Sequence, residues 1–370
     1  MNNTFDIAVI GAGIAGASVA AHLAASRSVC ILEMEDRPGF HTTGRSASAY
    51  EPNYGPAPML ALARASGVFF REPPVGFADA PLITPRGSLF FEATGQETAA
   101  AIFLNEASGL VEISEQEALG YFPILRQGYA KRIFRDGATG DLDVDLIHRG
   151  FLKQYKMAGG TLMNEAGAKS IRRKNGKWLI TTAKGELITD IIINAAGAWG
   201  DVVANMAGVK PVGLTPKRRS IGVIPIDHQG LENWPMVTDV GETFYAKPQS
   251  GKLLVSSADE TPVEPHDAYG DDMAIAEGIE RLMNATTIEV THLDHSWGGL
   301  RTFAPDGSPV VGFDQHTEEF FWLVGQGGYG IQSSPALSRT AATMVMKQPL
   351  PEDVLAAGLN INDILPNRLR

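Results

Sequence analysis

The sequence has a single cysteine, no long apolar run, and fewer basic than acidic residues. Cys30 alone cannot form an internal disulfide, which is typical of a reducing compartment, so we expect a cytoplasmic location. No apolar run approaches the roughly 18 residues of a membrane-spanning helix, and the N-terminal segment lacks the basic head and cleavage site of a signal peptide. The net charge of -11 argues against a nucleic-acid partner, because a phosphate backbone is bound by clustered Lys and Arg.

The 370 residues predict roughly two domains, and 44% hydrophobic with 20% charged residues is ordinary for a globular protein. Residues 5–10 and 29–32 are apolar runs on either side of an alanine-rich, helix-prone segment, which is typical of a βαβ unit. Residues 219–260 hold short β-like runs separated by Pro and Gly, as in an antiparallel sheet. Further elements are expected as helices at 58–70, 145–157 and 335–347, and as strands at 81–92, 177–195, 309–313 and 320–325, whereas 120–140 shows little periodicity. We therefore predict an α/β fold in which a Rossmann-like dinucleotide-binding domain is interleaved with an antiparallel-sheet α+β substrate domain.

A glycine motif follows the first strand as Gly11-x-Gly13-x-x-Gly16. In such a motif the first glycine permits a tight turn, the second lets the backbone approach a pyrophosphate, and the third allows close packing of helix on strand. The pyrophosphate then meets free N–H groups at the helix N-terminus. Glu33 follows the second strand, where a carboxylate can accept hydrogen bonds from ribose hydroxyls. The motif therefore predicts a dinucleotide site.

The segment after Glu33 favours FAD over NAD as the dinucleotide. A nicotinamide enzyme would normally continue into further βα units, but here residues 42–46 read Thr-Thr-Gly-Arg-Ser. Such a segment can surround a second phosphate and a ring system with hydroxyls and backbone amides.

Five motifs in order resemble those of the D-amino-acid oxidase superfamily of FAD enzymes, over essentially the whole chain. They are GAGIAG with Glu33, TTGRSA, IIINAAGAWGD at 191–201, GGLRTFAPDGSPVVG at 298–312, and GQGGYGIQSSPA at 325–336. Within this superfamily, residues 41–55, 215–220, 242–248 and 325–332 are most similar to the D-arginine dehydrogenases. The resemblance implies an FAD-binding domain of residues 1–80, 139–203 and 299–370, and a substrate-binding domain of residues 81–138 and 204–298.

The resemblance also implies which residues hold FAD, and that no covalent bond tethers it, since Cys30 lies beside the adenosine half. The glycine-rich loop at 325–330 precedes a helix, whose N–H groups can face the electron-rich part of a reduced flavin. The implied cofactor-binding residues are Gly11, Gly13, Ala15, Gly16, Glu33, Met34, Thr42, Thr43, Gly44, Arg45, Ser46, Ala47, Ala49, Ala168, Gly197, Gly327, Gly328, Tyr329, Gly330, Ile331 and Gln332.

An amino-acid oxidase must hold a carboxylate while presenting Cα–H to the flavin. Arginine suits this task because its planar fork matches two carboxylate oxygens, and Arg301 matches the carboxylate-binding arginine of the family. Tyr54 and Tyr245 match substrate-contacting tyrosines, and a phenol can donate to a carboxylate. Arg219 and Gly328 complete the implied catalytic set.

Two positions depart from the arginine-directed pattern. Ser88 stands near the place where those relatives carry a glutamate, so a cationic substrate side chain loses its obvious partner. Ala49 replaces a histidine. Glu51 lies in the same loop and could supply a substitute carboxylate, but its direction cannot be read from the sequence.

We therefore expect an FAD-dependent D-amino-acid dehydrogenase or oxidase that passes a hydride from Cα to flavin N5. The imino acid then hydrolyses to a 2-oxo acid and ammonia, and oxygen, a quinone or a carrier accepts the electrons. The alternatives are a secondary-amine oxidase of the sarcosine or glycine type, a 2-hydroxy-acid dehydrogenase, or a flavoprotein subunit of a multi-subunit dehydrogenase. No metal site is expected, because His292 and His295 do not align in a strand-like region, and the acidic run 141–145 is expected to cap the following helix.

Overall fold

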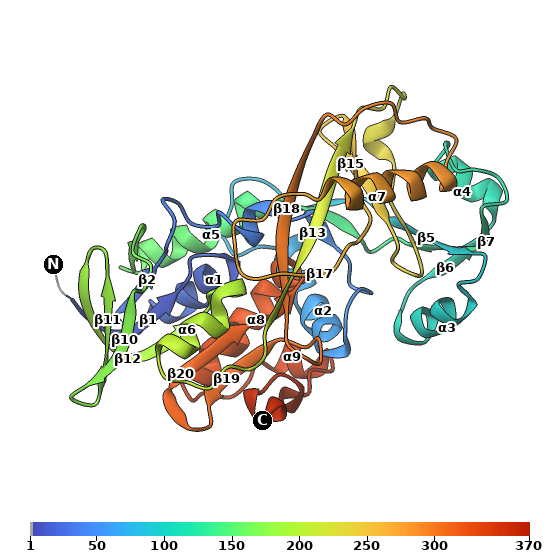
Figure 1. Ribbon diagram of the computed structural model, residues 1–370. Coiled ribbons are helices and arrows are strands. Elements are labelled where there is room, and N and C mark those ends of the chain that lie inside the picture. The colour runs from blue at the N-terminus through green and yellow to red at the C-terminus, as the bar shows by residue number, and fades with distance from the viewer. Residues whose placement is uncertain (1–2) are drawn as a thin grey trace.

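The computed structural model describes residues 3–370, whose strands form two large sheets and one small one (Figure 1). The first sheet has a parallel centre in the order β9, β2, β1, β12, β20, and β10, β11 and β19 extend it in antiparallel fashion. Its strands are β1 (Thr4–Ile10), β2 (Val29–Leu32), β9 (Thr161–Met163), β10 (Ser170–Lys174), β11 (Lys177–Thr182), β12 (Gly185–Asn194), β19 (Val310–Asp314) and β20 (Thr317–Val324).

Both faces of this sheet are covered, and successive apolar side chains of β1 are buried on opposite faces. Ile7 and Val9 belong to the cluster formed with the long helices, whereas Ala8 and Ile10 belong to a second cluster with Trp322 on the opposite face. Helix α1 packs against α5 and α8, and α2 packs against α8. The helices of this half are α1 (Ile14–Leu23), α2 (Ala57–Arg71), α5 (Val144–Met157), α6 (Gly200–Met206), α8 (Gly330–Val345) and α9 (Glu352–Ala356), with the 3-10 turns η1 (Thr42–Arg45), η2 (Gly197–Trp199), η4 (Ile361–Asp363) and η5 (Pro366–Leu369).

The second sheet has the order β21, β18, β13, β16, β15, β14, β5, β7, β6, with β17 beside β13. Its pairings are antiparallel except for β14 on β5. The strands are β5 (Ser88–Ala93), β6 (Val111–Ile113), β7 (Ala130–Asp136), β13 (Thr215–Ile224), β14 (Met236–Asp239), β15 (Tyr245–Gln249), β16 (Lys252–Ser256), β17 (Thr261–Pro262), β18 (His295–Phe303) and β21 (Gln326–Gly327). The accompanying helices are α3 (Glu97–Glu106), α4 (Glu115–Tyr121), α7 (Asp272–Ala285) and η3 (Leu231–Asn233).

The second sheet also has two faces of different character. Leu89 and Phe91 of β5 enter an apolar cluster with Leu282 of α7 and Ala118 of α4. The intervening Phe90 faces the opposite way and lines a large cavity. A small third sheet of β3 (Ala49–Tyr50), β8 (Gly140–Leu142) and β4 (Ile83–Pro85) anchors the loop before Tyr54.

The predicted mixed α/β fold is confirmed, and the antiparallel character of residues 219–260 is confirmed with it. The division into two domains stays a prediction; the boundary that we placed between residues 298 and 299 falls inside β18, and β21 pairs with that strand. Asp143 caps α5 as expected, since its side chain accepts a hydrogen bond from Leu146 N at 2.8 Å.

Two predicted elements differ from the structure. Residues 120–140 contain the strand β7, which pairs with β5 and β6 although its own periodicity is weak. Helix α8 begins at Gly330 rather than at Pro335. Proline at this position cannot donate to the carbonyl of Ile331. The hydroxyl of Ser334 donates to that carbonyl instead, at 2.9 Å, so the helix continues through the proline.

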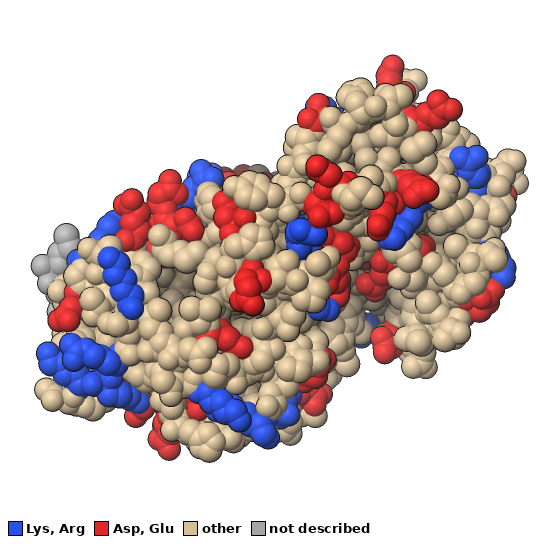
Figure 2. Space-filling model, in the orientation of Figure 1, with Lys and Arg blue, Asp and Glu red and all other residues tan. Residues whose placement is uncertain are grey.

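Charged side chains are interspersed on the face shown in Figure 2, with a basic group over the hairpin of β10 and β11. Basic residues of that hairpin pair with acidic neighbours, as Arg173 does with Glu319 and Lys177 does with Asp190 at 2.7 Å. Within residues 3–370, no helix is both long and apolar enough to cross a membrane.

Candidate active site

A long cavity lies between the two sheets and extends from the glycine turn after β1 to the inner face of β5, β14 and β15. It is lined by residues of η1, β18 and the start of α8 as well, so segments far apart in the sequence share one wall. The predicted cofactor and substrate residues can therefore be placed along a single continuous space.

The turn between β1 and α1 can be built only with glycine. Gly11 has φ +101°, and a Cβ there would lie 2.6 Å from the carbonyl oxygen of Ala195. A Cβ on Gly16 would lie 1.9 Å from the carbonyl oxygen of Gly11, so the helix packs directly on the turn. The N-cap residue of α1, Gly13, has no side chain, and Thr43 Oγ1 accepts from Ile14 N at 3.0 Å, so the next N–H groups of the first turn are the ones left for an anion at this end of the cavity.

Glu33 lies at the cavity wall immediately after β2 and is buried. Its Oε2 accepts a hydrogen bond from Ala12 N at 2.8 Å, and its Oε1 accepts one from Glu35 N at 3.0 Å. The carboxylate thus ties the glycine turn to the end of β2 and keeps lone pairs at the position predicted to meet a ribose.

The segment Thr42–Arg45 is a 3-10 turn whose side chains are largely engaged with the protein. Thr42 Oγ1 donates to Leu300 O at 2.7 Å, and Thr43 Oγ1 accepts from Ile14 N at 3.0 Å. Arg45 donates to Ala268 O at 2.7 Å and forms an ion pair with Asp267. These groups join the two halves of the molecule, so a role in cofactor binding would fall mainly to backbone groups of the segment.

Most of the predicted cofactor residues line the cavity, and three do not. Gly16 faces Gly11, Gly44 faces the carbonyl of Gly39, and the Tyr329 ring packs edge-on against Tyr54 with centroids 5.1 Å apart. The residues that line it are Gly11, Gly13, Ala15, Glu33, Met34, Thr42, Thr43, Arg45, Ser46, Ala47, Ala49, Ala168, Gly197, Gly327, Gly328, Gly330, Ile331 and Gln332.

The polar groups of the cavity wall fit FAD. Thr302 Oγ1 and Gln326 Nε2 are buried there without a hydrogen-bond partner among the described residues. Helix α8 starts at the cavity without a side-chain cap. Buried polar atoms and free helix N–H groups are costly to leave unsatisfied, and a ligand rich in phosphate, carbonyl and ring nitrogen groups satisfies them.

Arg301 of β18 projects into the far end of the cavity. Its Nη1 lies 3.4 Å from Tyr54 Oη, and it has no carboxylate ion-pair partner within residues 3–370. Arginine stays charged in proteins, and a desolvated charge calls for an opposite charge. The arrangement therefore leaves room for an anionic group of a ligand.

Two tyrosines stand beside Arg301 at the cavity wall. Burial raises the pKa of Tyr54, partly offset by Arg301, so its hydroxyl stays protonated and can donate. Tyr245 Oη is buried with no partner among the described residues. The pair offers phenol donors at the place where an anion would meet Arg301.

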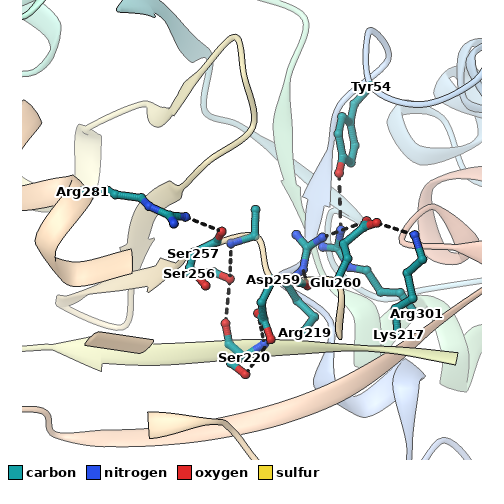
Figure 3. A network of polar contacts seen from close by, with 11 residues as sticks. Tyr54, Lys217, Arg219, Ser220, Ser256, Ser257, Asp259, Glu260, Arg281 and Arg301 are labelled. Atoms are coloured by element: carbon teal, nitrogen blue, oxygen red, sulfur yellow. Dashed lines mark hydrogen bonds and ion pairs between the residues drawn. The ribbon is translucent and has the colours of Figure 1, made fainter. Parts of the chain in front are cut away.

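Arg219 also reaches the cavity wall, but most of its bonds go to the protein (Figure 3). Its Nε donates to Asp259 O at 2.9 Å, and its Nη2 lies 3.3 Å from Glu260 Oε1. Glu260 also pairs with Lys217 at 2.6 Å. Arg219 is only 4% exposed, so it is a fixed member of the wall rather than the solvated charge that it would ordinarily be.

The cavity also includes two acidic residues outside the predicted set of site residues: Glu51, whose direction the sequence left open, and Glu242. Glu51 lines it and its Oε1 accepts a hydrogen bond from Ser88 Oγ, which answers the question of its direction. Glu242, in the turn between β14 and β15, lies near Tyr54, Arg219 and Arg301, and desolvation raises its pKa. The segment 242–248 was singled out by its resemblance, but Glu242 itself was not predicted as a site residue, because its place depends on how the turn folds over the second sheet.

Comparisons with known proteins identify the family. Residues 6–344 match the family described as DAO, FAD dependent oxidoreductase. Glycine oxidase of Bacillus licheniformis is 24% identical over 379 residues, covering 96% of this chain and 97% of the relative. Human mitochondrial sarcosine dehydrogenase is 29% identical over 161 residues, which is 41% of this chain and 17% of that protein.

Solved structures show the same fold. Glycine oxidase from Geobacillus kaustophilus superposes with a TM-score of 0.82 at 19% identity, covering 97% of this chain and 99% of that chain. L-proline dehydrogenase from P. horikoshii gives a TM-score of 0.82 at 20% identity, with 95% and 96% covered. The expected similarity to D-arginine dehydrogenases stays a prediction. The chain belongs to the DAO family of FAD-dependent oxidoreductases.

Proposed function

We propose that this protein oxidises the Cα–N bond of α-amino acids and that D-amino acids are its substrates. The observation that carries the proposal is Arg301, a cation on the cavity wall that contacts the Tyr54 hydroxyl and lies beside the unpartnered Tyr245 hydroxyl. It forms no ion pair within residues 3–370, although Glu242 lies in its vicinity. A substrate carboxylate supplies the missing charge and accepts from the arginine fork and the phenols.

The residues of the wall divide the work of holding the substrate. Arg301, Tyr54 and Tyr245 fix the carboxylate. When the carboxylate and Cα–H are both fixed, the side chain of only one enantiomer fits the remaining space. The reaction removes a hydride from Cα and a proton from the neutral amine, leaving a C=N bond; water then adds and ammonia leaves. Bound FAD supplies the hydride acceptor. We assign no side chain as the base, because a substrate that binds with a neutral amine needs none.

FAD is proposed to bind without a covalent bond. Cys30 is buried in β2, and burial raises the pKa of its thiol to about 12, so it does not provide a thiolate. Acid or heat denaturation should therefore release free FAD. If flavin stays on the chain, His41 is the first residue to test, since its ring lines the cavity.

Oxidation of glycine or of a secondary amine is the second candidate, because curated relatives of this chain include glycine oxidase and sarcosine dehydrogenase. A panel of D-amino acids, their L-enantiomers, glycine and N-methyl amino acids, mixed anaerobically with the holoenzyme, separates the two. Flavin bleaching by D-amino acids with primary amines supports the proposal. Bleaching by sarcosine or glycine alone establishes the second candidate. Reoxidation of the bleached enzyme by oxygen or by a quinone then identifies the acceptor.

A further inference from the structure

A buried carboxyl group with one free oxygen lies on the wall of the cavity. Glu51 is 6% exposed and follows β3, and its backbone N–H donates to Gln332 Oε1 at 2.7 Å, which fixes the loop to α8. Its Oε1 accepts from Ser88 Oγ, whereas its Oε2 has no hydrogen-bond partner within residues 3–370. An unpaired buried carboxylate oxygen is unfavourable unless a ligand or a proton occupies it.

The nearby charged groups do not neutralise Glu51. The ammonium of Lys247 in β15 lowers the pKa of Glu51, but it forms its ion pair with Asp141 of β8, at 2.5 Å, and not with Glu51. Asp141 itself and Asp136 of β7 are further carboxylates close enough to disfavour ionisation of Glu51. Burial is the main cause that raises the pKa of Glu51 to about 8, and Asp136 and Asp141 add to it. Arg86 also pairs with Asp141 at 2.5 Å, so both nearby cations are engaged by that carboxylate and neither occupies the free Oε2 of Glu51, which stays open to an incoming cation.

The register of the second sheet indicates that Glu51 lies further along the cavity than the residues that bind the carboxylate. In the register of the second sheet, Tyr245 pairs with Thr238, which pairs with Phe90, and all three line the cavity. Ser88 lies two residues from Phe90 on β5, so its side chain is on the same face, about 7 Å further along the strand. Glu51 accepts a hydrogen bond from Ser88 and itself lines the cavity, so it is offset along β5 from the carboxylate-binding end, as the end of an extended substrate side chain would be.

We propose that Glu51 binds a cationic group, an ammonium or guanidinium, at the end of the substrate side chain, so that basic D-amino acids are favoured substrates. The inference rests on the proposed function, since the substrate carboxylate must be held at Arg301. A cation entering the cavity pairs with Oε2 and displaces the proton from the carboxyl group, whereas a neutral side chain leaves that oxygen without an ionic partner. Ser88, which seemed to leave this place uncharged, instead orients the carboxyl group.

The test uses pairs of ligands that differ only in the terminal ammonium and have no α-amine to oxidise. Pentanoate is compared with 5-aminopentanoate, and hexanoate with 6-aminohexanoate, by titration calorimetry of the holoenzyme at pH 8.5. At least one aminoalkanoate should bind roughly 10- to 100-fold more tightly than its alkanoate, as expected for one charged hydrogen-bonded pair. Glu51→Gln should abolish the difference while leaving alkanoate binding within about twofold.

Proton release gives a second readout that is independent of affinity. In buffers of different ionisation enthalpy at pH 7, 5-aminopentanoate or 6-aminohexanoate should release close to one proton from the wild-type protein. Glu51→Gln should release none. Ser88→Ala is the matched control: it keeps the carboxyl group, so proton release persists and shifts to higher pH, because Ser88 normally lowers the pKa of Glu51.

The outcomes separate this inference from the proposed function. If alkanoates bind and the ammonium adds nothing in the wild-type protein, the assignment of Glu51 is overturned and the carboxylate site stands. If neither class binds and no amino acid bleaches the flavin, both are overturned. If Glu51→Gln loses FAD, the wild-type protein is titrated at pH 6 and at pH 9 instead. The affinity ratio of aminoalkanoate to alkanoate must be larger at pH 9, where Glu51 is ionised. An equal ratio at the two pH values contradicts the proposal.

Discussion

The guanidinium of Arg301 lies directly against the Cα of Gly328. A Cβ at residue 328 would stand 2.7 Å from Arg301 Nη1 and 2.8 Å from its Cζ. The glycine-rich loop before α8 therefore does more than present helix N–H groups to the cavity. It also leaves the space in which the arginine of β18 lies.

Gly328→Ala should displace Arg301 without unfolding the protein. The added methyl group is too close to the guanidinium, so the arginine must shift and its 3.4 Å contact with Tyr54 Oη must change. We expect kcat/KM per bound flavin to fall on the order of 100-fold, as is typical when a positioning group shifts by about 1 Å. Gly120→Ala in α4 is the control, since a Cβ there meets nothing within 4 Å. Steady-state kinetics per bound flavin that match the wild type would contradict this role of Gly328.

Removing Arg301 tests the carboxylate clamp itself. Arg301→Ala should cost about 2–5 kcal/mol of transition-state stabilisation, or roughly 30- to several-thousand-fold in kcat/KM, while FAD stays bound. Arg301→Lys should recover only part of the loss, because an ammonium lacks the planar fork. A purely structural arginine would give the opposite pattern, with a lower melting temperature and nearly normal kinetics per folded molecule.

The local elements could be predicted from the sequence, whereas the position of Glu51 could not. The glycine turn at Gly11, the hairpin of β11 and β12, and helix α5 each follow from short-range patterns of glycine, apolar residues and caps. The start of α8 was predicted too late, because the hydroxyl of Ser334 compensates for Pro335. Whether Glu51 faces the cavity depends on its contact with Ser88, a residue 37 positions away on another sheet.

The same distinction applies to the substrate end. Arg301, Tyr54 and Tyr245 were proposed through motif resemblance, and the structure brings them to one cavity wall. Glu242 lies there too, in a turn with φ +53°, and although it begins the segment 242–248, the resemblance did not mark it as a site residue. Side chains gathered by long-range packing leave no periodic signal in the sequence.

Glu33 should contribute to FAD affinity. Glu33→Ala removes the acceptor for Ala12 N and the oxygens predicted to meet the ribose. Loss of charged hydrogen bonds of this kind costs about 1.5–3 kcal/mol, so the FAD dissociation constant should rise roughly 10- to 100-fold. Titration of the apoprotein with FAD, followed by flavin fluorescence, measures it. An unchanged constant would remove Glu33 from the cofactor site.

Glu51 should make stability depend on pH in a defined direction. Its pKa of about 8 in the folded protein lies above the ordinary value of 4.5, so the folded state binds the extra proton between these values. The contribution is fully present below pH 4.5 and is lost as the pH rises through 8. Each pKa unit corresponds to about 1.4 kcal/mol, so the wild type should lose more than about 1 kcal/mol relative to Glu51→Gln between pH 5.5 and 8.5. If the difference in unfolding free energy between the two proteins is the same at both pH values, the assignment is contradicted.

The most direct test of the central claim is an anaerobic titration of the holoenzyme with one pair of enantiomers, D- and L-lysine, with the products quantified. The account predicts that the D-enantiomer bleaches the flavin and yields one 2-oxo acid, or its cyclised imine, per flavin reduced, while the L-enantiomer leaves the spectrum unchanged. D- and L-methionine, treated in the same way, keep the test valid if the side-chain preference differs. Bleaching by neither D-enantiomer, or equal bleaching by both enantiomers of a pair, would contradict it.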